Sequence, residues 1–308
     1  MSKPETTSLY EFFKLFPDEE SARVYFETKR WGDHRSCPHC GSTNSVECKD
    51  HKPMPYRCRD CRKHFSVRTS TVLAESKIEL HKWLMAIYMM TTARKGIPST
   101  QMARELGITQ KSAWFLALRI RETWLNNKPK DGGSLGGEVE VDETYIGGKE
   151  MNKHASKKLN AGRGTVGKII VAGIKQRSGH VVAEIVPSTS AKTLQAFIGR
   201  HVQAGSTVYT DEHSSYVGIP YNHLSVSHSA REYVNGIVHT NGIESFWALL
   251  KRGYYGVYHY MSVKHLYRYL NEFANRHNTA DLSTIEFIGA TVANISGKRL
   301  TYKELINA

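Results

Sequence analysis

The sequence predicts a multidomain α/β protein, with an N-terminal zinc ribbon and a helix-turn-helix-like helical region followed by an α/β domain. Three observations support this order. Two Cys-x-x-Cys pairs lie near the start, hydrophobic residues from Ile78 to Trp124 recur at helical spacing, and strict alternation begins at Glu138. The 308 residues exceed one average domain, and a hydrophobic content of 40% is enough to build several cores.

Composition narrows the class of partner. The chain has 42 Lys and Arg against 29 Asp and Glu, a formal net charge of +13. Such an excess favours a polyanionic partner, although many basic proteins bind no nucleic acid. The N-terminus shows no apolar signal segment and no run reaches the roughly 20 apolar residues of a membrane span. We therefore expect a cytoplasmic protein that makes no membrane contact and is nucleoid-associated when bound to DNA.

The changes of pattern divide the chain into four segments. We expect an N-terminal helix and a four-cysteine zinc ribbon over 1–70, and a helical DNA-binding region over 71–130. A catalytic α/β domain is expected over 131–280, after the Lys-, Pro- and Gly-rich linker at 128–134, and a C-terminal tail over 281–308.

All five cysteines lie in one short stretch, and four of them form two Cys-x-x-Cys pairs. Cys37 and Cys40 are separated by 17 residues from Cys58 and Cys61. Two such pairs can place four thiolates around one Zn²⁺, which fills its coordination sphere and makes the site structural. A redox pair is the weaker alternative. Arg59 and its basic neighbours are expected to contact DNA phosphates or to form a protein-docking surface.

Residues 99–114 follow the pattern of a helix-turn-helix motif. We expect Ser99 to cap a first helix, Gly107 to permit the turn and Thr109 to cap a second helix. Lys111 would then face outward at the start of the second helix, where a recognition helix contacts DNA. Arg119 and Arg121 extend the basic character. An ordinary helical hairpin remains the alternative.

The third segment alternates strands and helices. Predicted strands cover 138–142, 168–174, 180–186 and 208–211, the second and third forming a hairpin, and predicted helices cover 190–202, 241–252 and 263–277.

Three acids in this segment have the placement of a metal site. Asp142 and Asp211 each end a predicted strand, and Glu244 lies on the polar stripe of an amphipathic helix with Asn241 and Lys251. Hard carboxylate oxygens suit Mg²⁺, and two ions about 3.5–4 Å apart can serve an in-line displacement at phosphorus. The alternative is three unrelated surface acids.

Several stretches resemble one known family. They are FPDEE at 16–20, RWGD at 30–33, EVDETYIGG at 140–148, YTD at 209–211, HTNGIESFW at 239–247 and LKR at 250–252. In these stretches the chain resembles the DDE-type insertion-sequence transposases with an N-terminal zinc ribbon, the ISXO-like group, whose catalytic domain is RNase H-like. The resemblance extends from about residue 10 to about residue 280.

The resemblance implies an activity and a set of site residues. Asp142 and Asp211 match the first two ligands of two Mg²⁺ or Mn²⁺ ions, Glu244 is expected as the third, and Asn241 as a supporting or alternative one. The expected reaction is cleavage and transfer of DNA strands at the terminal inverted repeats of an insertion sequence, by a homo-oligomer on paired ends. The further candidates for contact with end or target DNA are Lys251, Arg252, Lys157 and Lys158.

Two other functions fit parts of the same pattern. A catalytically retired transposase would act as a sequence-specific DNA-binding regulator, but all three acids are present, which argues against it. An RNase H-type nuclease would act on RNA or structured DNA, and Lys251 and the N-terminal modules argue against that.

Overall fold

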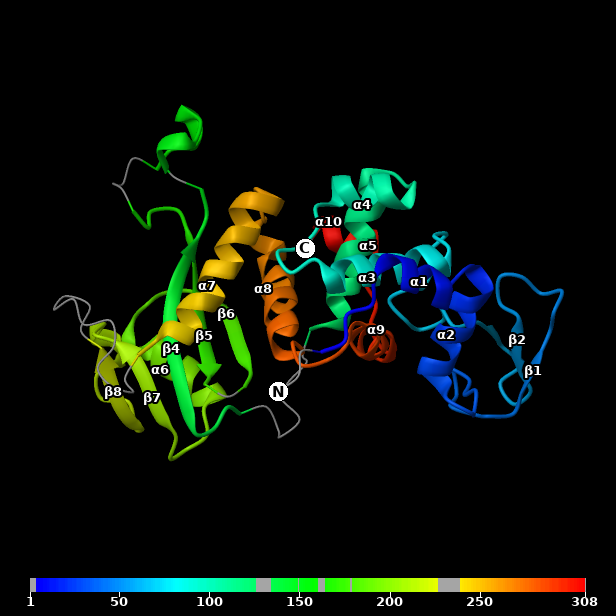
Figure 1. Ribbon diagram of the computed structural model, residues 1–308, viewed down its shortest axis with the longest axis horizontal. Helices are drawn as coiled ribbons and strands as arrows, with labels where there is room; N and C mark the ends of the chain where they lie inside the picture. Colours follow the sequence, from blue (N-terminus) through cyan, green and yellow to red (C-terminus); the bar gives the residue numbers. More distant parts are fainter. Residues whose placement is uncertain are drawn as a thin grey trace. The chain divides into compact units, whose positions relative to one another are not determined.

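The computed structural model divides the chain into two compact units (Figure 1). It describes residues 4–125, 134–148, 150–159, 164–177, 179–226 and 239–307. The first unit combines residues up to 125 with those from 279 onward, and the second comprises 126–278. Each unit has its own hydrophobic core.

The first unit begins with two short helices, α1 (Leu9–Leu15) and α2 (Glu19–Trp31). Both start in capping boxes, in which the side chains of Ser8 and Asp18 accept hydrogen bonds from backbone N–H groups of the first turn. The α2 helix lies where the sequence predicts a helix before the zinc ribbon. Its end is set by Gly32 at a positive φ of 57°.

The zinc-ribbon segment is a three-stranded antiparallel sheet. Its strands are β1 (Ser45–Glu47), β2 (Tyr56–Cys58) and β3 (His64–Phe65), in that spatial order. Tyr56 and Phe65 are buried with two of the cysteines, and Trp31 packs against them. So small a core cannot hold the strands alone, which is why a metal-binding residue set matters here.

Three further helices follow in the first unit, α3 (Leu80–Thr92), α4 (Ser99–Leu106) and α5 (Gln110–Thr123). Gly107 ends α4 in the left-handed conformation, and the Thr109 side chain accepts a hydrogen bond from the Ser112 N–H at 3.2 Å. The expected cap by Ser99 is wrong. Pro98 precedes the helix without a side-chain cap, and the Ser99 hydroxyl instead accepts a hydrogen bond from Gln110.

The arginines that we expected to extend the basic surface of α5 are buried. Arg119 is 5% exposed and Arg121 is 2% exposed. The Arg119 guanidinium donates to the carbonyl oxygen of Ala74 and lies 5.5 Å from the ring of Trp83. These residues stabilise the helical core and present no charge to a ligand.

Residues 281–308 were expected to be a tail, but the chain from residue 279 onward belongs to the first unit. They form α9 (Thr284–Ala293) and α10 (Tyr302–Asn307). Phe287, Ile288 and Val292 of α9 are buried in the same core as α3 and α5. The indole of Trp124 donates a buried hydrogen bond to the hydroxyl of Thr291 at 3.0 Å. The first unit is therefore built from two segments that are far apart in the sequence.

The second unit is built on a five-stranded mixed sheet. Its strands are β4 (Glu138–Ile146), β5 (Ile169–Gln176), β6 (Val181–Val186), β7 (Thr207–Asp211) and β8 (Asn222–Val226), in the spatial order β6-β5-β4-β7-β8. The first three pair antiparallel, whereas β7 pairs parallel with both β4 and β8. The predicted hairpin is confirmed as β5 and β6.

Helices cover both faces of this sheet. On one face α6 (Ala191–His201) buries Leu194 and Phe197 against Val139 and Val141 of β4. On the other lie α7 (Asn241–Gly253) and α8 (Val263–Asn278), side by side in Figure 1, joined by the π-helix η4 (Tyr254–Tyr258). Because strand side chains alternate, the even-numbered residues of β4 face α7. The fold class predicted from the sequence is confirmed.

Three short 3-10 helices complete the unit: η1 (Glu150–Asn152), η2 (Ala155–Lys157) and η3 (Ser214–Tyr216). In the part of the chain that the structure describes, no helix is both long and apolar enough to cross a membrane.

Candidate metal centres and nucleic-acid contacts

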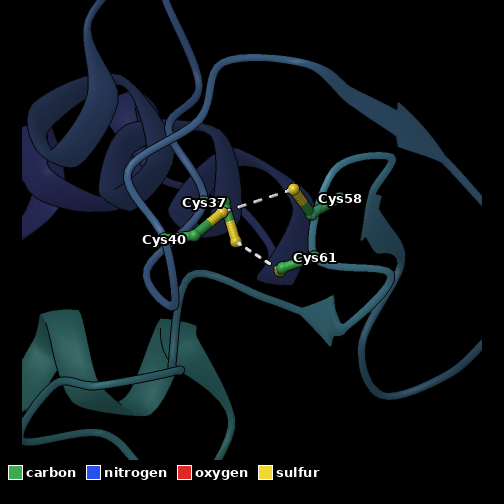
Figure 2. Close-up of side chains that lie close together, drawn as sticks. All are labelled: Cys37, Cys40, Cys58 and Cys61. Atoms are coloured by element: carbon green, nitrogen blue, oxygen red, sulfur yellow. Dashed lines mark hydrogen bonds between the residues drawn. The ribbon is translucent and has the colours of Figure 1, made fainter.

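The four predicted zinc ligands come together between two loops of the ribbon (Figure 2). The Sγ atoms of Cys37 and Cys61 are 3.7 Å apart, and those of Cys40 and Cys58 are 3.6 Å apart. A tetrahedral Zn²⁺ with bonds of about 2.3 Å requires ligand sulfurs about 3.8 Å from one another. The four cysteines thus have the spacing of a structural zinc site with four thiolate ligands.

The two cysteine loops differ in how they treat their thiols. In the second loop, hydrogen bonds from the backbone N–H groups of Cys61 and Asp60 help to lower the pKa of the Cys58 thiol to about 7, whereas the pKa of Cys40 in the first loop is raised to about 12. In that first loop the Gly41 N–H donates to the carbonyl oxygen of Cys37 at 2.8 Å, which closes the turn around the first pair. Deprotonated sulfur is the form that binds zinc, so the donors around Cys58 assist metal binding.

The two aspartates predicted at strand ends lie on neighbouring parallel strands. The last paired residues of β4 and β7 are Glu140 and Tyr209. Asp142 and Asp211 each follow two positions later, so they extend from the same edge and the same face of the sheet. Both carboxylates accept a backbone hydrogen bond, Asp142 from Glu143 at 2.8 Å and Asp211 from His213 at 3.0 Å.

The third predicted acid, Glu244, lies in the first turn of α7. Ile243, Phe246, Trp247 and Leu250 are the buried face of this helix, as predicted. Asn241 and Glu244 are exposed on the opposite stripe. The Thr240 hydroxyl donates to one oxygen of the Glu244 carboxylate at 2.9 Å, which orients that side chain.

The electrostatic environment of Asp142 indicates that the three acids belong to one site. Burial, followed by the negative charges of Glu143, Asp211 and Glu244, raises the pKa of the Asp142 carboxyl to about 7, against one backbone hydrogen bond. Asp211 and Glu244 therefore lie close enough to Asp142 for their charges to act on it. A divalent cation would relieve this repulsion, so the donor set fits a hard metal ion.

The three carboxylates are more widely spaced than the thiolates. Within the described ranges, only the four cysteines bring three or more potential ligand atoms within 4.8 Å of one another. The acids come from two strands and one helix, so their spacing depends on how these three elements pack. The spacing of the thiolates is set by two tight loops.

Glu143 has its own partner beside the site. Its carboxylate accepts a hydrogen bond from the hydroxyl of Tyr216 at 2.6 Å. Burial, followed by the charge of Glu143, raises the pKa of the Tyr216 phenol well above its ordinary value. Tyr216 therefore remains protonated and holds Glu143 on the opposite face of β4 from Asp142.

Sequence reasoning missed a buried network around Glu140. This carboxylate is 1% exposed and lies on the same face of β4 as Asp142. It accepts a hydrogen bond from the Ile243 N–H of α7 at 2.9 Å and one from the Nε of Arg177 at 3.3 Å. The alternation of residues 138–142 gave no local signal for this, because it places Glu140 on the polar face of the strand.

The predicted DNA-binding residues lie in both units. Lys251 and Arg252 are exposed near the end of α7, two turns after Glu244. Lys111 is exposed in the first turn of α5, with its ammonium 4.5 Å from the ring centre of Tyr302. Arg59 is exposed in the second cysteine loop.

The two remaining basic candidates belong to the segment after β4. Lys158 is exposed directly after η2. Lys157 is the last residue of that short helix, and its side chain falls outside the described atoms.

Comparison with known families decides the class of protein. A family model described as an ISXO2-like transposase domain matches residues 134–278, and a transposase zinc-ribbon domain matches residues 17–64. Together the two matches cover well over half of the 308 residues. The chain belongs to the ISXO2-like transposase family. The first match covers the five-stranded unit and its acids, and the second includes all four zinc ligands.

Individual relatives are more distant from this transposase. A protein of Halobacterium salinarum, described as an uncharacterized protein in transposable element ISH50, is 28% identical over 254 residues, which are 78% of this chain and 84% of the relative. Among solved structures, a pre-cleavage Mos1 transpososome matches 66% of this chain and 75% of its own chain, at 13% identity and a TM-score of 0.26.

Proposed function

We propose that this transposase cuts and joins DNA strands at a site formed by Asp142, Asp211 and Glu244, which hold two Mg²⁺ or Mn²⁺ ions. The observation that supports it best is the placement of Asp142 and Asp211 at the same edge and face of the sheet, where burial and the charges of Glu143, Asp211 and Glu244 together raise the pKa of Asp142 to about 7. Three carboxylates on separate elements provide the oxygen ligands that these cations require.

The proposed reaction is the same displacement performed twice. Water first attacks the phosphorus of a phosphodiester at the end of the element and releases a strand with a free 3′-hydroxyl. That hydroxyl then attacks a phosphodiester of target DNA, and the 3′-oxygen of the target leaves. When bound, the two cations would activate the attacking oxygen and stabilise the leaving one.

The residues of the chain would orient the ligands and the DNA. The Thr240 hydroxyl and the Glu143 and His213 amides hold the three carboxylates. Asn241 is exposed one turn before Glu244, where its amide oxygen would support the third ligand position. Lys251 and Arg252 would bind backbone phosphates near the cations.

The first unit would recognise the ends of the element. Lys111 begins a capped helix after a glycine turn, the geometry of a recognition helix, and Arg59 adds positive charge in the zinc ribbon. We propose that the protein acts as a homo-oligomer, since two ends must be cut and joined in one reaction.

The test is cleavage of DNA that carries the flanking inverted repeats, with Mg²⁺ or Mn²⁺. We expect Asp142→Asn, Asp211→Asn and Glu244→Gln each to lower the rate of nicking by more than about 100-fold. Loss of an outer-shell partner usually lowers activity by about 10- to 100-fold, and loss of a metal ligand should lower it more. Binding of the same DNA should remain. Asp281→Asn, which removes an exposed acid distant in sequence from the site, is the matched control.

Asn241→Ala completes the series and shows whether Asn241 is a metal ligand or a supporting residue. A loss as large as that of Glu244→Gln would make Asn241 a ligand, and a loss below about 100-fold would leave it a supporting residue. Nicking by Asp142→Asn at the wild-type rate would contradict the assignment of the site.

A further inference from the structure

We propose that Glu140 is a positioning residue for the metal site, because it caps helix α7 from strand β4 and so sets the place of Glu244 and Asn241. The inference rests on the proposed function of the three acids. Nothing in the motif that predicted Asp142 assigns a role to the glutamate two positions before it.

Helix α7 lacks a side-chain cap of its own. The first N–H groups of a helix have no partner within it, and the residue before the helix usually supplies an acceptor. Here that residue is Thr240, whose side chain makes no such bond and donates to Glu244 instead. The Ile243 N–H is satisfied by Glu140 at 2.9 Å, in a buried position.

The packing at this point leaves no freedom for the helix to shift. A Cβ atom added at Gly242 would lie 2.7 Å from the Glu140 Oε2 and 3.2 Å from its Cδ. The glycine therefore permits the close approach of the helix start to the carboxylate. Farther along, a Cβ on Gly173 would lie 2.4 Å from the ring of Trp247, so the same helix is seated on β5 as well.

The buried charge of Glu140 is compensated from the adjoining elements. The Nε of Arg177 donates to its Oε1 at 3.3 Å, and the Nδ1 of His239 lies 3.3 Å from the same oxygen. Arg177 also donates to the carbonyl oxygen of His239 at 3.2 Å. An ion pair this deep is costly to leave incomplete, so it fixes the geometry of the groups it joins.

The Glu140 carboxylate thus links strand β4, the first turn of α7 and the segment before that helix, whose relative positions set the geometry of the proposed site. Glu140 belongs to the strand of Asp142, accepts a hydrogen bond from the backbone one residue before Glu244, and lies 3.3 Å from the Nδ1 of His239 in the segment that enters α7. A displacement of the helix start by a fraction of an ångström would move Glu244 relative to Asp142. Such outer-shell partners affect metal affinity by about 10- to 100-fold.

Glu138 provides a matched control on the same strand. It lies on the same face and also binds Arg177, at 3.3 Å, and it accepts a hydrogen bond from Tyr209. Among the described residues, these hydrogen bonds of its carboxylate do not extend to the backbone of α7. Glu138→Gln therefore perturbs the arginine without removing the cap.

The experiment compares Glu140→Gln and Glu138→Gln in the full chain by three measurements. Calorimetry measures the affinity for Mn²⁺. A titration gives the Mg²⁺ concentration for half-maximal nicking, and amide hydrogen exchange measures how often the first turn of α7 opens. The amide of Gln has one acceptor where Glu140 uses two. We expect Mn²⁺ affinity to fall by about 10- to 100-fold with a matching rise in the Mg²⁺ requirement, and faster exchange at Ile243. Glu138→Gln should stay near wild type.

A purely structural role would give a different result. It would lower the fraction of active protein but leave the half-maximal Mg²⁺ concentration unchanged, and that outcome would overturn the proposal. Gly242→Ala is the second variant, which displaces the carboxylate without removing it. If Glu140→Gln fails to fold, a folded Gly242→Ala protein with wild-type Mn²⁺ affinity would also overturn it.

The outcomes separate this inference from the proposed function. If Asp142→Asn and Glu244→Gln abolish metal binding and nicking while Glu140→Gln changes neither, the metal site stands and the positioning role is wrong. If Asp142→Asn and Glu244→Gln leave both unchanged, the proposed function itself fails.

Discussion

At the scale of single residues, Asp142 shows how a proposed catalytic position can oppose stability. Its carboxyl is buried beside three other acids, and its pKa is raised to about 7 from an ordinary value of 3.8. The folded protein therefore binds a proton more tightly than the unfolded chain, and stability falls as the pH rises between these two values. Above about pH 7 the full cost of the charge is present.

We therefore expect Asp142→Asn to stabilise the second unit in magnesium-free buffer. The gain should be small near pH 4 and should grow to about 1–3 kcal/mol at pH 8, since each pKa unit corresponds to about 1.4 kcal/mol and partial hydration reduces the effect. Melting temperatures of wild type and variant across this pH range measure it. Asp281→Asn should show no such trend, and an equal or lower melting temperature for Asp142→Asn at pH 8 would contradict the prediction.

The acids of the proposed site could be singled out from the sequence, whereas their supports could not. Asp142 and Asp211 end alternating strands, and Glu244 falls on the polar stripe of a helix, patterns that are local. Glu140 has the same local pattern as any alternating strand residue. Its role depends on Ile243, about a hundred positions later, and only the fold brings the two together.

At the scale of elements, α7 depends on one glycine of the neighbouring strand. Gly173 pairs with Asp142 across the β4–β5 ladder and lies under the ring of Trp247. We expect Gly173→Ala to destabilise the second unit by about 1–3 kcal/mol, the usual cost of overpacking, and to reduce nicking. Thermal melting and the cleavage assay would show both effects.

Gly199→Ala is the control for this substitution. Gly199 is a helical residue of α6 with nothing within 4 Å of an added Cβ. Alanine there should be neutral or stabilising by up to about 1 kcal/mol. If both alanine variants behaved alike, the close packing of α7 on β5 would not be the cause.

The helix-turn-helix-like pair leads to a prediction about DNA. Lys111 is exposed in the first turn of α5, where we propose that it contacts a phosphate or a base edge. Lys111→Glu should weaken binding of end DNA and lower the slope of log affinity against log salt by about one, the effect of one lost phosphate contact. Titrations at several salt concentrations measure this slope.

Lys14→Glu is a matched control for the loss of a lysine. Lys14 is also exposed, and its ammonium lies 4.4 Å over the ring of Tyr10, much as that of Lys111 lies over Tyr302. An equal loss of affinity in both variants would indicate a general effect of net charge. Binding by Lys111→Glu that matches wild type would exclude α5 as a recognition helix.

At the scale of the whole molecule, the first unit depends on a helix that follows the second unit in the sequence. Ile288 of α9 is fully buried in the core of the N-terminal helices. Ile288→Ala should destabilise the first unit by about 2–5 kcal/mol, the cost of a large-to-small core change. The affinity for end DNA should fall at elevated temperature, with metal binding at the acids unchanged.

An exposed isoleucine from the same terminal region provides the comparison. Ile306 of α10 is 49% exposed, so Ile306→Ala should leave the melting of the first unit within about 0.5 kcal/mol of wild type. Loss of Mn²⁺ binding in Ile288→Ala would contradict the separation of the two units.

The folded C-terminus is the largest difference between expectation and structure. Residues 284–293 are almost entirely apolar or small, and a short apolar run can be read as a tail segment or as a core helix. Its partners lie in a segment that ends at residue 125. Periodicity carries no information about which distant core a helix joins, whereas the four cysteines of the zinc ribbon, which are close in sequence, could be predicted.

The discontinuous first unit also has a consequence for protein synthesis. Chains emerge from the ribosome N-terminus first, and domains generally fold as units as they appear. The unit with the acids, 126–278, can be complete while the helices before it still await α9. A product that stops before α9 would then carry a complete second unit, with the proposed metal site, beside an unfinished first unit. Folding of the first unit has to wait until the chain has been translated through α9.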